Sequence, residues 1–164
     1  MLKCIAAKIV PMARSQRKAC ARIVALSEPW KTLRERIDFS KSTALNKAYV
    51  YLQDGEVGGF IIFTPEPIFA RGGYIRAVAV APAVRRHGIG KRLLTFAETV
   101  IARRSQNVYL CVSSFNRRGQ RFYQSLGYKR VGRIPDLIAR GTSEHIYWKC
   151  LRPSAAKNRR TQRP

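Results

Sequence analysis

Residues 78–94 have the sequence VAVAPAVRRHGIGKRLL, in which an apolar strand pattern leads through a basic, glycine-containing turn into a helical pattern. The apolar run at residues 74–80 predicts a buried strand with simply alternating side chains, and Pro82 is expected to stop it. Apolar residues at helical spacing predict a helix over residues 90–104. Glycines let backbone N–H groups approach a ligand closely, and the free N–H groups of a helix start favour an anion. The stretch therefore predicts an anion-binding turn between a strand and a helix.

Two familiar phosphate-binding loops do not fit this turn. A Walker loop requires glycine where Arg85 stands and Ser or Thr where Arg92 stands. A dinucleotide fingerprint requires a third glycine at Leu93 and an acidic residue about 20 positions further on, where the apolar residues 108–110 lie. What remains is Arg-x-x-Gly-x-Gly at residues 85–90. Taken alone, this pattern is equally compatible with a strand-to-helix turn that carries surface arginines.

The rest of the chain predicts a single mixed α/β domain over residues 1–151, followed by a basic, disordered tail at 152–164. Further strand patterns occupy residues 2–10, 48–52, 56–63, 107–113, 129–134 and 145–151, and helical patterns occupy 14–26, a short segment at Trp30 and 116–126. The Asp54-Gly55 pair predicts a hairpin whose second strand ends at Pro65 and Pro67. The strand at 107–113 follows a helical crossover, so it can pair in parallel with the strand at 74–80.

The composition argues against a membrane protein, a secreted protein and a metal-binding or disulfide-rich protein. No apolar run approaches the ~20 residues of a membrane span, and no signal peptide is evident, so the expected location is cytoplasmic and no membrane partner is expected. The four cysteines and two histidines are too dispersed for a metal site or a disulfide framework, so no metal is expected.

The chain is strongly basic, with 32 Lys and Arg against 9 Asp and Glu and a net charge of +23. Residues 1–151 alone carry 27 basic and 9 acidic residues, or +18, so the charge is not confined to the tail. Such a field attracts phosphates, RNA or acidic proteins and disfavours polycationic substrates. An equally simple interpretation is a generally basic protein, because net charge bears on solubility and non-specific contacts.

A second motif occupies the helical pattern at 116–126. Asn116 precedes the helix, Phe122-Tyr123 lie within it, and Gly127-Tyr128 follow it. Together with the turn at 85–90 and the intervening strand, this motif resembles the GNAT superfamily of N-acetyltransferases over about residues 48–151. The resemblance implies a mixed α/β fold, with a mostly antiparallel central sheet, one splayed parallel pair and helices on both faces.

The resemblance also implies a donor and a set of binding residues. The donor is acetyl-coenzyme A, which an amine attacks directly. The implied cofactor-binding residues are Val78, Ala79, Val80, Arg85, Arg86, His87, Gly88, Ile89, Gly90, Lys91 and Asn116. By resemblance, the strand residues hold the pantetheine arm and the amides of the turn hold the pyrophosphate. Tyr123, which would otherwise be a core residue, is implied to protonate the departing thiolate.

The base that removes the amine proton is not indicated by a motif. In the branch that acetylates ribosomal-protein N-termini, a Glu in the strand before the Asn acts as base, but Cys111 stands at that position here. Glu28, between the two N-terminal helices, is the first candidate and Glu144, at the edge of a closing strand, is the second. Glu28 can equally serve as a charge that interacts favourably with a helix terminus, without a catalytic role. Removal of the amine proton by a chain of water molecules is an equally open alternative.

The resemblance implies that the acceptor is a primary amine of an unidentified protein, peptide or small metabolite, and the positive field argues against polyamines and aminoglycosides. The alternative is a nucleic-acid or ribosome-associated protein that uses the fold as an inactive or coenzyme A-binding scaffold. The sequence also leaves open the use of longer acyl groups and the formation of a homodimer.

Overall fold

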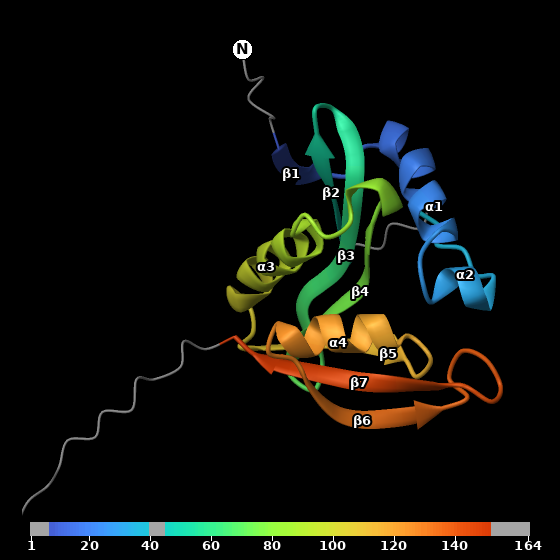
Figure 1. The fold of residues 1–164 in the computed structure, drawn as a ribbon. Helices are drawn as coiled ribbons and strands as arrows, with labels where there is room; N and C mark the ends of the chain where they lie inside the picture. Colours follow the sequence, from blue (N-terminus) through green and yellow to red (C-terminus); the bar gives the residue numbers. More distant parts are fainter. Residues whose placement is uncertain (1–6, 40–44, 152–164) are drawn as a thin grey trace, which may run out of the picture.

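The computed structural model describes residues 7–39 and 45–151, which form a seven-stranded sheet with helices on both faces (Figure 1). The strands are β1 (Ala7–Pro11), β2 (Lys47–Gln53), β3 (Glu56–Phe69), β4 (Gly72–Val80), β5 (Asn107–Ser113), β6 (Lys129–Pro135) and β7 (Ser143–Cys150). The helices are α1 (Arg17–Ala25), α2 (Trp30–Leu33), α3 (Ile89–Ala102) and α4 (Arg117–Ser125), with single 3-10 turns at Arg14–Gln16 and Pro82–Val84.

The sheet has the order β1-β2-β3-β4-β5-β7-β6, and only β4 and β5 pair in parallel. Their pairing runs from Gly73 opposite Val108 to Ile75 opposite Leu110 and then stops. Both strands continue beyond that point, β4 to Val80 and β5 to Ser113, without pairing to each other. The predicted mixed sheet with one splayed parallel pair is therefore confirmed.

A β-bulge in β4 overturns the simple alternation that the sequence predicts for residues 74–80. Ile62 of β3 pairs with Ala77 and Phe63 pairs with Ile75, so Arg76 is an extra residue in β4. An extra residue reverses the faces of all the side chains that follow it. As a result Ile75 and Val78 both pack on the side of α3, whereas Ala77 packs on the side of α1.

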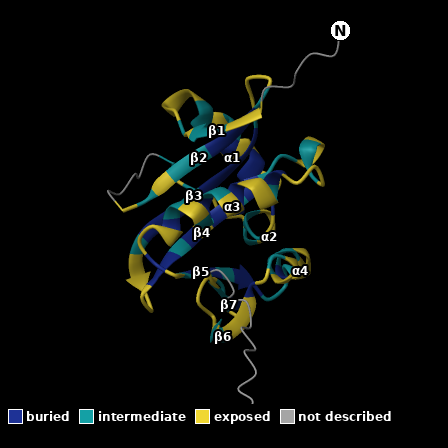
Figure 2. Cartoon of the chain, turned by 90° about the vertical axis from the view of Figure 1, so that its left-hand side faces the viewer, coloured by how far each residue is buried: buried dark blue, intermediate teal, exposed yellow. Residues whose placement is uncertain are grey.

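Apolar side chains fill the space on each side of the sheet. Leu93, Leu94, Ala97 and Ile101 form one stripe of α3 and are buried against the sheet, as their helical spacing predicts. On the opposite side, Cys20, Ile23 and Val24 of α1 pack on Val50 and Phe60. Figure 2 shows buried, dark blue segments in the central strands, interrupted by intermediate positions. The sheet is therefore covered by packed helices on both faces, and the ends of its central strands β4 and β5 have fixed positions.

The ends of two elements, β3 and α2, need a structural explanation. β3 continues past Pro65 and Pro67 to Phe69, because β2 pairs only as far as Phe63 and the prolines lie where that neighbour is absent and the β3–β4 ladder is irregular. α2 stops at Leu33, since Arg34 takes a left-handed conformation with φ 55°. The start of the predicted first strand and the predicted tail lie outside the described residues.

Within the described ranges, none of the helices has the length and apolar character to span a membrane.

Replacing Leu93 by Ala tests the packing of α3. Leu93 is fully buried, so the substitution leaves a cavity and is expected to lower the free energy of unfolding by about 2–5 kcal/mol in urea denaturation. Leu137→Ala is the control, because Leu137 is 54% exposed and its truncation is expected to change stability by less than ~0.5 kcal/mol. Equal effects of the two substitutions would contradict this packing.

Candidate active site

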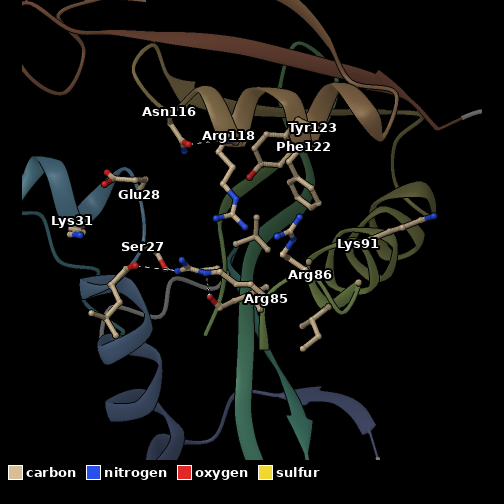
Figure 3. A pocket seen from close by; sticks show the side chains of 18 residues that line it. Ser27, Glu28, Lys31, Arg85, Arg86, Lys91, Asn116, Arg118, Phe122 and Tyr123 are labelled. Carbon is tan, nitrogen blue, oxygen red and sulfur yellow. Dashed lines mark hydrogen bonds between the residues drawn. The ribbon is translucent and has the colours of Figure 1, made fainter. Parts of the chain in front are cut away.

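A pocket of about 570 Å³ lies where the end of β4, the start of α3, the start of α4 and the loop between α1 and α2 meet (Figure 3). Ten of the eleven residues predicted to bind a cofactor line it, namely Val78, Ala79, Val80, Arg85, Arg86, Gly88, Ile89, Gly90, Lys91 and Asn116. Tyr123 and Glu28 line it as well. His87 does not; its side chain is exposed to solvent beside the turn. The structure thus gathers residues from four separate segments into one place.

The turn before α3 has the geometry of an anion site. Gly88 caps the helix in a left-handed conformation with φ 75°, which favours glycine over other residues. Gly90 lies so close to the Phe122 ring that an added Cβ would be 3.1 Å from Cζ. The first N–H groups of α3 have no acceptor within the helix, and they carry its positive dipole end. The start of α3 therefore presents backbone donors to the pocket.

Positive side chains reinforce this end of the pocket. Figure 3 shows Arg86 from the turn and Arg118 from α4 reaching into the same space from opposite walls, while Lys91 extends away from them. Arg118 is not among the site residues predicted from the sequence. Its position four residues before Phe122, on the same face of α4, is the signal that could have revealed it. Two guanidinium groups facing one space suit a phosphorylated ligand.

Arg85 contributes differently from its neighbour Arg86. Its Nε donates to the carbonyl oxygen of Val80 at 3.0 Å. Its Nη2 donates to the carbonyl oxygen of Leu26 at 3.1 Å and to Ser27 Oγ at 2.9 Å. Burial, followed by the nearby charge of Arg118, lowers the pKa of Arg85. Arg85 therefore joins the end of β4 to the α1–α2 loop and fixes two walls of the pocket.

Two residues of the second motif also reach the pocket. Asn116 caps α4, with Oδ1 accepting a hydrogen bond from the Gly119 N–H at 2.9 Å, as a helix N-cap should. Tyr123 packs between the rings of Phe122 and Tyr128, at centroid distances of 5.3 and 5.8 Å. Burial raises the pKa of Tyr123, so its hydroxyl keeps its proton at neutral pH and can act as a donor.

The acidic candidates lie in contrasting environments. Glu28 is exposed at the rim, and its Oε2 accepts a hydrogen bond from the Thr32 N–H at 3.3 Å, an interaction typical of a helix-terminus charge. Glu144 and Cys111 do not line this pocket; they lie on β7 and β5. No group of three or more His, Cys, Asp or Glu side chains that could hold a metal occurs in residues 7–39 and 45–151.

The sheet with its parted parallel strands, together with the glycine-containing turn between β4 and α3, is the fold of the acetyltransferases described next. Residues 13–128 match the sequence model of the Acetyltransferase (GNAT) family, and the chain belongs to this family. No curated protein sequence matches it significantly.

Solved structures share this fold at low sequence identity. The ribosomal-protein-S18-alanine N-acetyltransferase from Escherichia coli is 19% identical, with 93% of this chain and 98% of that chain covered and a TM-score of 0.69. An aminoglycoside 6'-N-acetyltransferase complexed with coenzyme A is also 19% identical, with 91% and 99% covered and a TM-score of 0.70. Ard1 from Thermoplasma volcanium is 22% identical, with 91% and 100% covered and a TM-score of 0.72.

Replacing Arg85 by Lys tests its role in joining the pocket walls. Lysine keeps the charge but cannot reproduce the three hydrogen bonds, so the free energy of unfolding is expected to fall by about 1–3 kcal/mol. The measurement is chemical denaturation, with hydrogen exchange of residues 26–33 as a local probe. Arg86→Lys, at the exposed neighbouring position, should change neither quantity. An unchanged α1–α2 loop in the Arg85 variant would contradict the bridging role.

Proposed function

We propose that this chain is an acetyl-coenzyme A-dependent N-acetyltransferase that transfers an acetyl group directly to a primary amine. The observation that carries the proposal is that the turn before α3, the end of β4 beyond its pairing with β5, and Tyr123 line the same pocket. GNAT proteins typically use acetyl-coenzyme A, and one structural neighbour is complexed with coenzyme A. The donor groups of the pocket fit that molecule, since it has an anionic end and an extended amide arm.

The residues of the pocket have different roles in binding acetyl-coenzyme A. Residues 86–91 at the start of α3 hold the pyrophosphate with backbone N–H groups, and Arg86 and Arg118 neutralise the phosphate charge. The backbone from Val78 to Val80 binds the pantetheine arm, because β4 has no pairing to β5 at this level. Asn116 holds the same arm from the other wall through its side-chain amide.

The reaction needs one acid and one base. As the amine nitrogen forms a bond to the thioester carbonyl carbon, the bond from carbon to sulfur breaks and a thiolate leaves. Tyr123 gives its hydroxyl proton to that sulfur, and the protonated state that burial favours suits this role. The amine proton passes to a base on the acceptor side. Holding both substrates in place supplies most of the rate acceleration.

The acceptor is proposed to be a protein or peptide amine, or a neutral or acidic metabolite. A net charge of +18 over residues 1–151 repels polycations at long range. The structural neighbours do not decide the class, because one is described as acting on ribosomal protein S18 and another on aminoglycosides. A cytoplasmic location is proposed along with this function, in keeping with the free thiols of Cys20, Cys111 and Cys150.

The experiment that tests the function is a screen of primary amines with acetyl-coenzyme A, monitored by release of free thiol. Calorimetric titration with acetyl-coenzyme A and with longer acyl-coenzyme A accompanies it. Amine-dependent thiol release supports the proposal. Steeply salt-dependent RNA binding without acetyl-coenzyme A binding would instead favour a scaffold that binds nucleic acid through its basic surface.

Replacing Tyr123 by Phe removes the proposed acid while keeping the ring. Turnover is expected to fall by about 10²-fold or more, because the thiolate would leave unprotonated. Acetyl-coenzyme A affinity, measured by calorimetry, should stay within about twofold, since the ring contacts with Phe122 and Tyr128 remain. A variant with undiminished turnover would exclude Tyr123 as the acid.

Arg118→Gln tests the phosphate assignment. The variant removes one of two guanidinium groups that face the pocket and is expected to weaken acetyl-coenzyme A binding about 5- to 20-fold, with a shallower salt dependence. Arg121→Gln is the matched control, because Arg121 lies on the same helix, is exposed and does not line the pocket. If both variants lose affinity equally, the effect is general electrostatics and Arg118 makes no direct contact.

A further inference from the structure

Glu144 is buried without a hydrogen-bond partner for one of its carboxylate oxygens. It lies on β7 directly opposite Ser113 of β5 and is only 3% exposed. Neither Glu144 Oε1 nor Ser113 Oγ has a hydrogen-bond partner among the described residues. An unpaired carboxylate oxygen costs free energy when buried, and groups kept at such a cost concentrate at functional sites.

The strand register places this carboxyl group in a small polar cluster. Tyr109 pairs with Tyr74 of β4, and alternation puts Tyr109, Cys111 and Ser113 on one face of β5. Glu144 shares that face because it pairs with Ser113. The intervening residues Leu110 and Val112 belong to the α3 core, so the cluster faces the opposite side, on which α1 packs. Glu35, just after α2, interacts electrostatically with Glu144 from that side.

The cluster lies at the place where β4 and β5 part. Pairing between the two strands ends at Leu110, immediately before Cys111. Ser113 is followed within three residues by Asn116, which lines the pocket and donates its backbone N–H to the Ser113 carbonyl oxygen at 2.9 Å. The cofactor pocket and Glu144 therefore both lie beside the part of the sheet where β4 and β5 no longer pair with each other.

We propose that Glu144 is the catalytic base of this chain, and that it receives a primary amine as an ammonium ion from the α2 side of the sheet. The inference rests on the proposed acetyl transfer and adds the residue that binds and deprotonates the acceptor. One ammonium N–H donates to Oε1 and its proton passes to that oxygen. The nitrogen lone pair then forms the bond to the thioester carbonyl carbon, and Tyr123 protonates the leaving sulfur.

The neighbouring groups leave Glu144 as the proton acceptor of the cluster. Burial raises the pKa of the Cys111 thiol, and burial together with Cys111 raises the pKa of the Tyr74 hydroxyl, so both stay protonated at neutral pH. Burial also raises the pKa of Glu144, and the negative charge of Glu35 adds to this effect, whereas the polar hydroxyl of the facing Ser113, although too poorly placed for a hydrogen bond, offsets part of it. A carboxyl group with a raised pKa is a stronger base than one in water.

The remaining neighbours complete this environment. Arg76, the extra residue of the β4 bulge, interacts electrostatically with Tyr74, and Ile134 of β6 faces Glu144 with an apolar side chain. The rival base, Glu28, is exposed and accepts a backbone hydrogen bond, so it lacks the buried setting that strengthens a carboxylate base.

The test compares Glu144→Gln with the wild type on the best acceptor from a panel of short peptides with free N-terminal amines and small primary amines. The kcat/KM of the variant is expected to fall at least 10²-fold at neutral pH and to recover as pH rises, because the amine must then lose its proton unaided. Acetyl-coenzyme A affinity should not change. Glu66→Gln, which removes an exposed carboxylate paired with Arg104, is the charge control and should behave as wild type.

A second variant and a stability measurement separate a base from a structural residue. Glu35→Gln should move the acidic limb of the wild-type pH profile to lower pH, because it removes a negative charge that raises the pKa of Glu144. A raised pKa in the folded state means that wild-type stability falls as pH rises through that pKa. Glu144→Gln should therefore show its largest gain in Tm over wild type above neutral pH and a smaller gain in acid.

The outcomes are distinct. If Glu144→Gln turns over at the wild-type rate with an unchanged pH profile, or if only Glu28→Gln loses activity, Glu144 is not the base although the acetyltransferase function stands. If the wild type neither binds acetyl-coenzyme A nor releases thiol with any amine, the proposed function fails and the base assignment fails with it.

Discussion

Unpaired backbone groups at the ends of β4 and β5 are the constraint on which the rest of the structure depends. Parallel neighbours that stop pairing after Ile75 and Leu110 leave N–H and C=O groups without sheet partners. Such groups need other partners, because burying them unpaired costs free energy. The bulge at Arg76 adds to this by turning the last residues of β4 relative to the first. An extended ligand with amide groups can form hydrogen bonds to these backbone groups, as a neighbouring strand would.

Charged side chains are distributed unequally around the opening, by which we mean the place where β4 and β5 stop pairing with each other. The start of α3 and the guanidinium groups of Arg86 and Arg118 line the pocket, where we propose that phosphates bind. The opposite side carries Glu144 and Glu35, although the whole chain has only 9 acidic residues. The net charge therefore describes the long-range field and does not describe the local environment of Glu144. This arrangement suits two substrates of opposite charge that react at one carbonyl carbon.

The sequence predicted the motifs well and the side-chain environments poorly. The turn at 85–90 and Asn116 with Tyr123 could be found because their spacing is local and depends on helix and turn geometry, and the parted parallel pair followed from the resemblance. The bulge at Arg76 could not be found, since nothing in a strand pattern marks one extra residue. The two acidic candidates were ranked by chain position, and neither the exposure of Glu28 nor the burial of Glu144 follows from local sequence.

Arg85 shows how the two sides of the opening are connected. Its three hydrogen bonds join the end of β4 to the loop that leads into α2. Glu35, which interacts electrostatically with Glu144, follows α2 in the chain. A phosphorylated ligand next to Arg85 would offset the unfavourable effects of burial and of Arg118 on its guanidinium group, because it would supply a nearby negative charge. A ligand at the turn and the loop that leads into α2 would then be coupled through this one side chain. Such coupling is reciprocal, so an acceptor that orders the loop must also strengthen binding at the turn by the same factor.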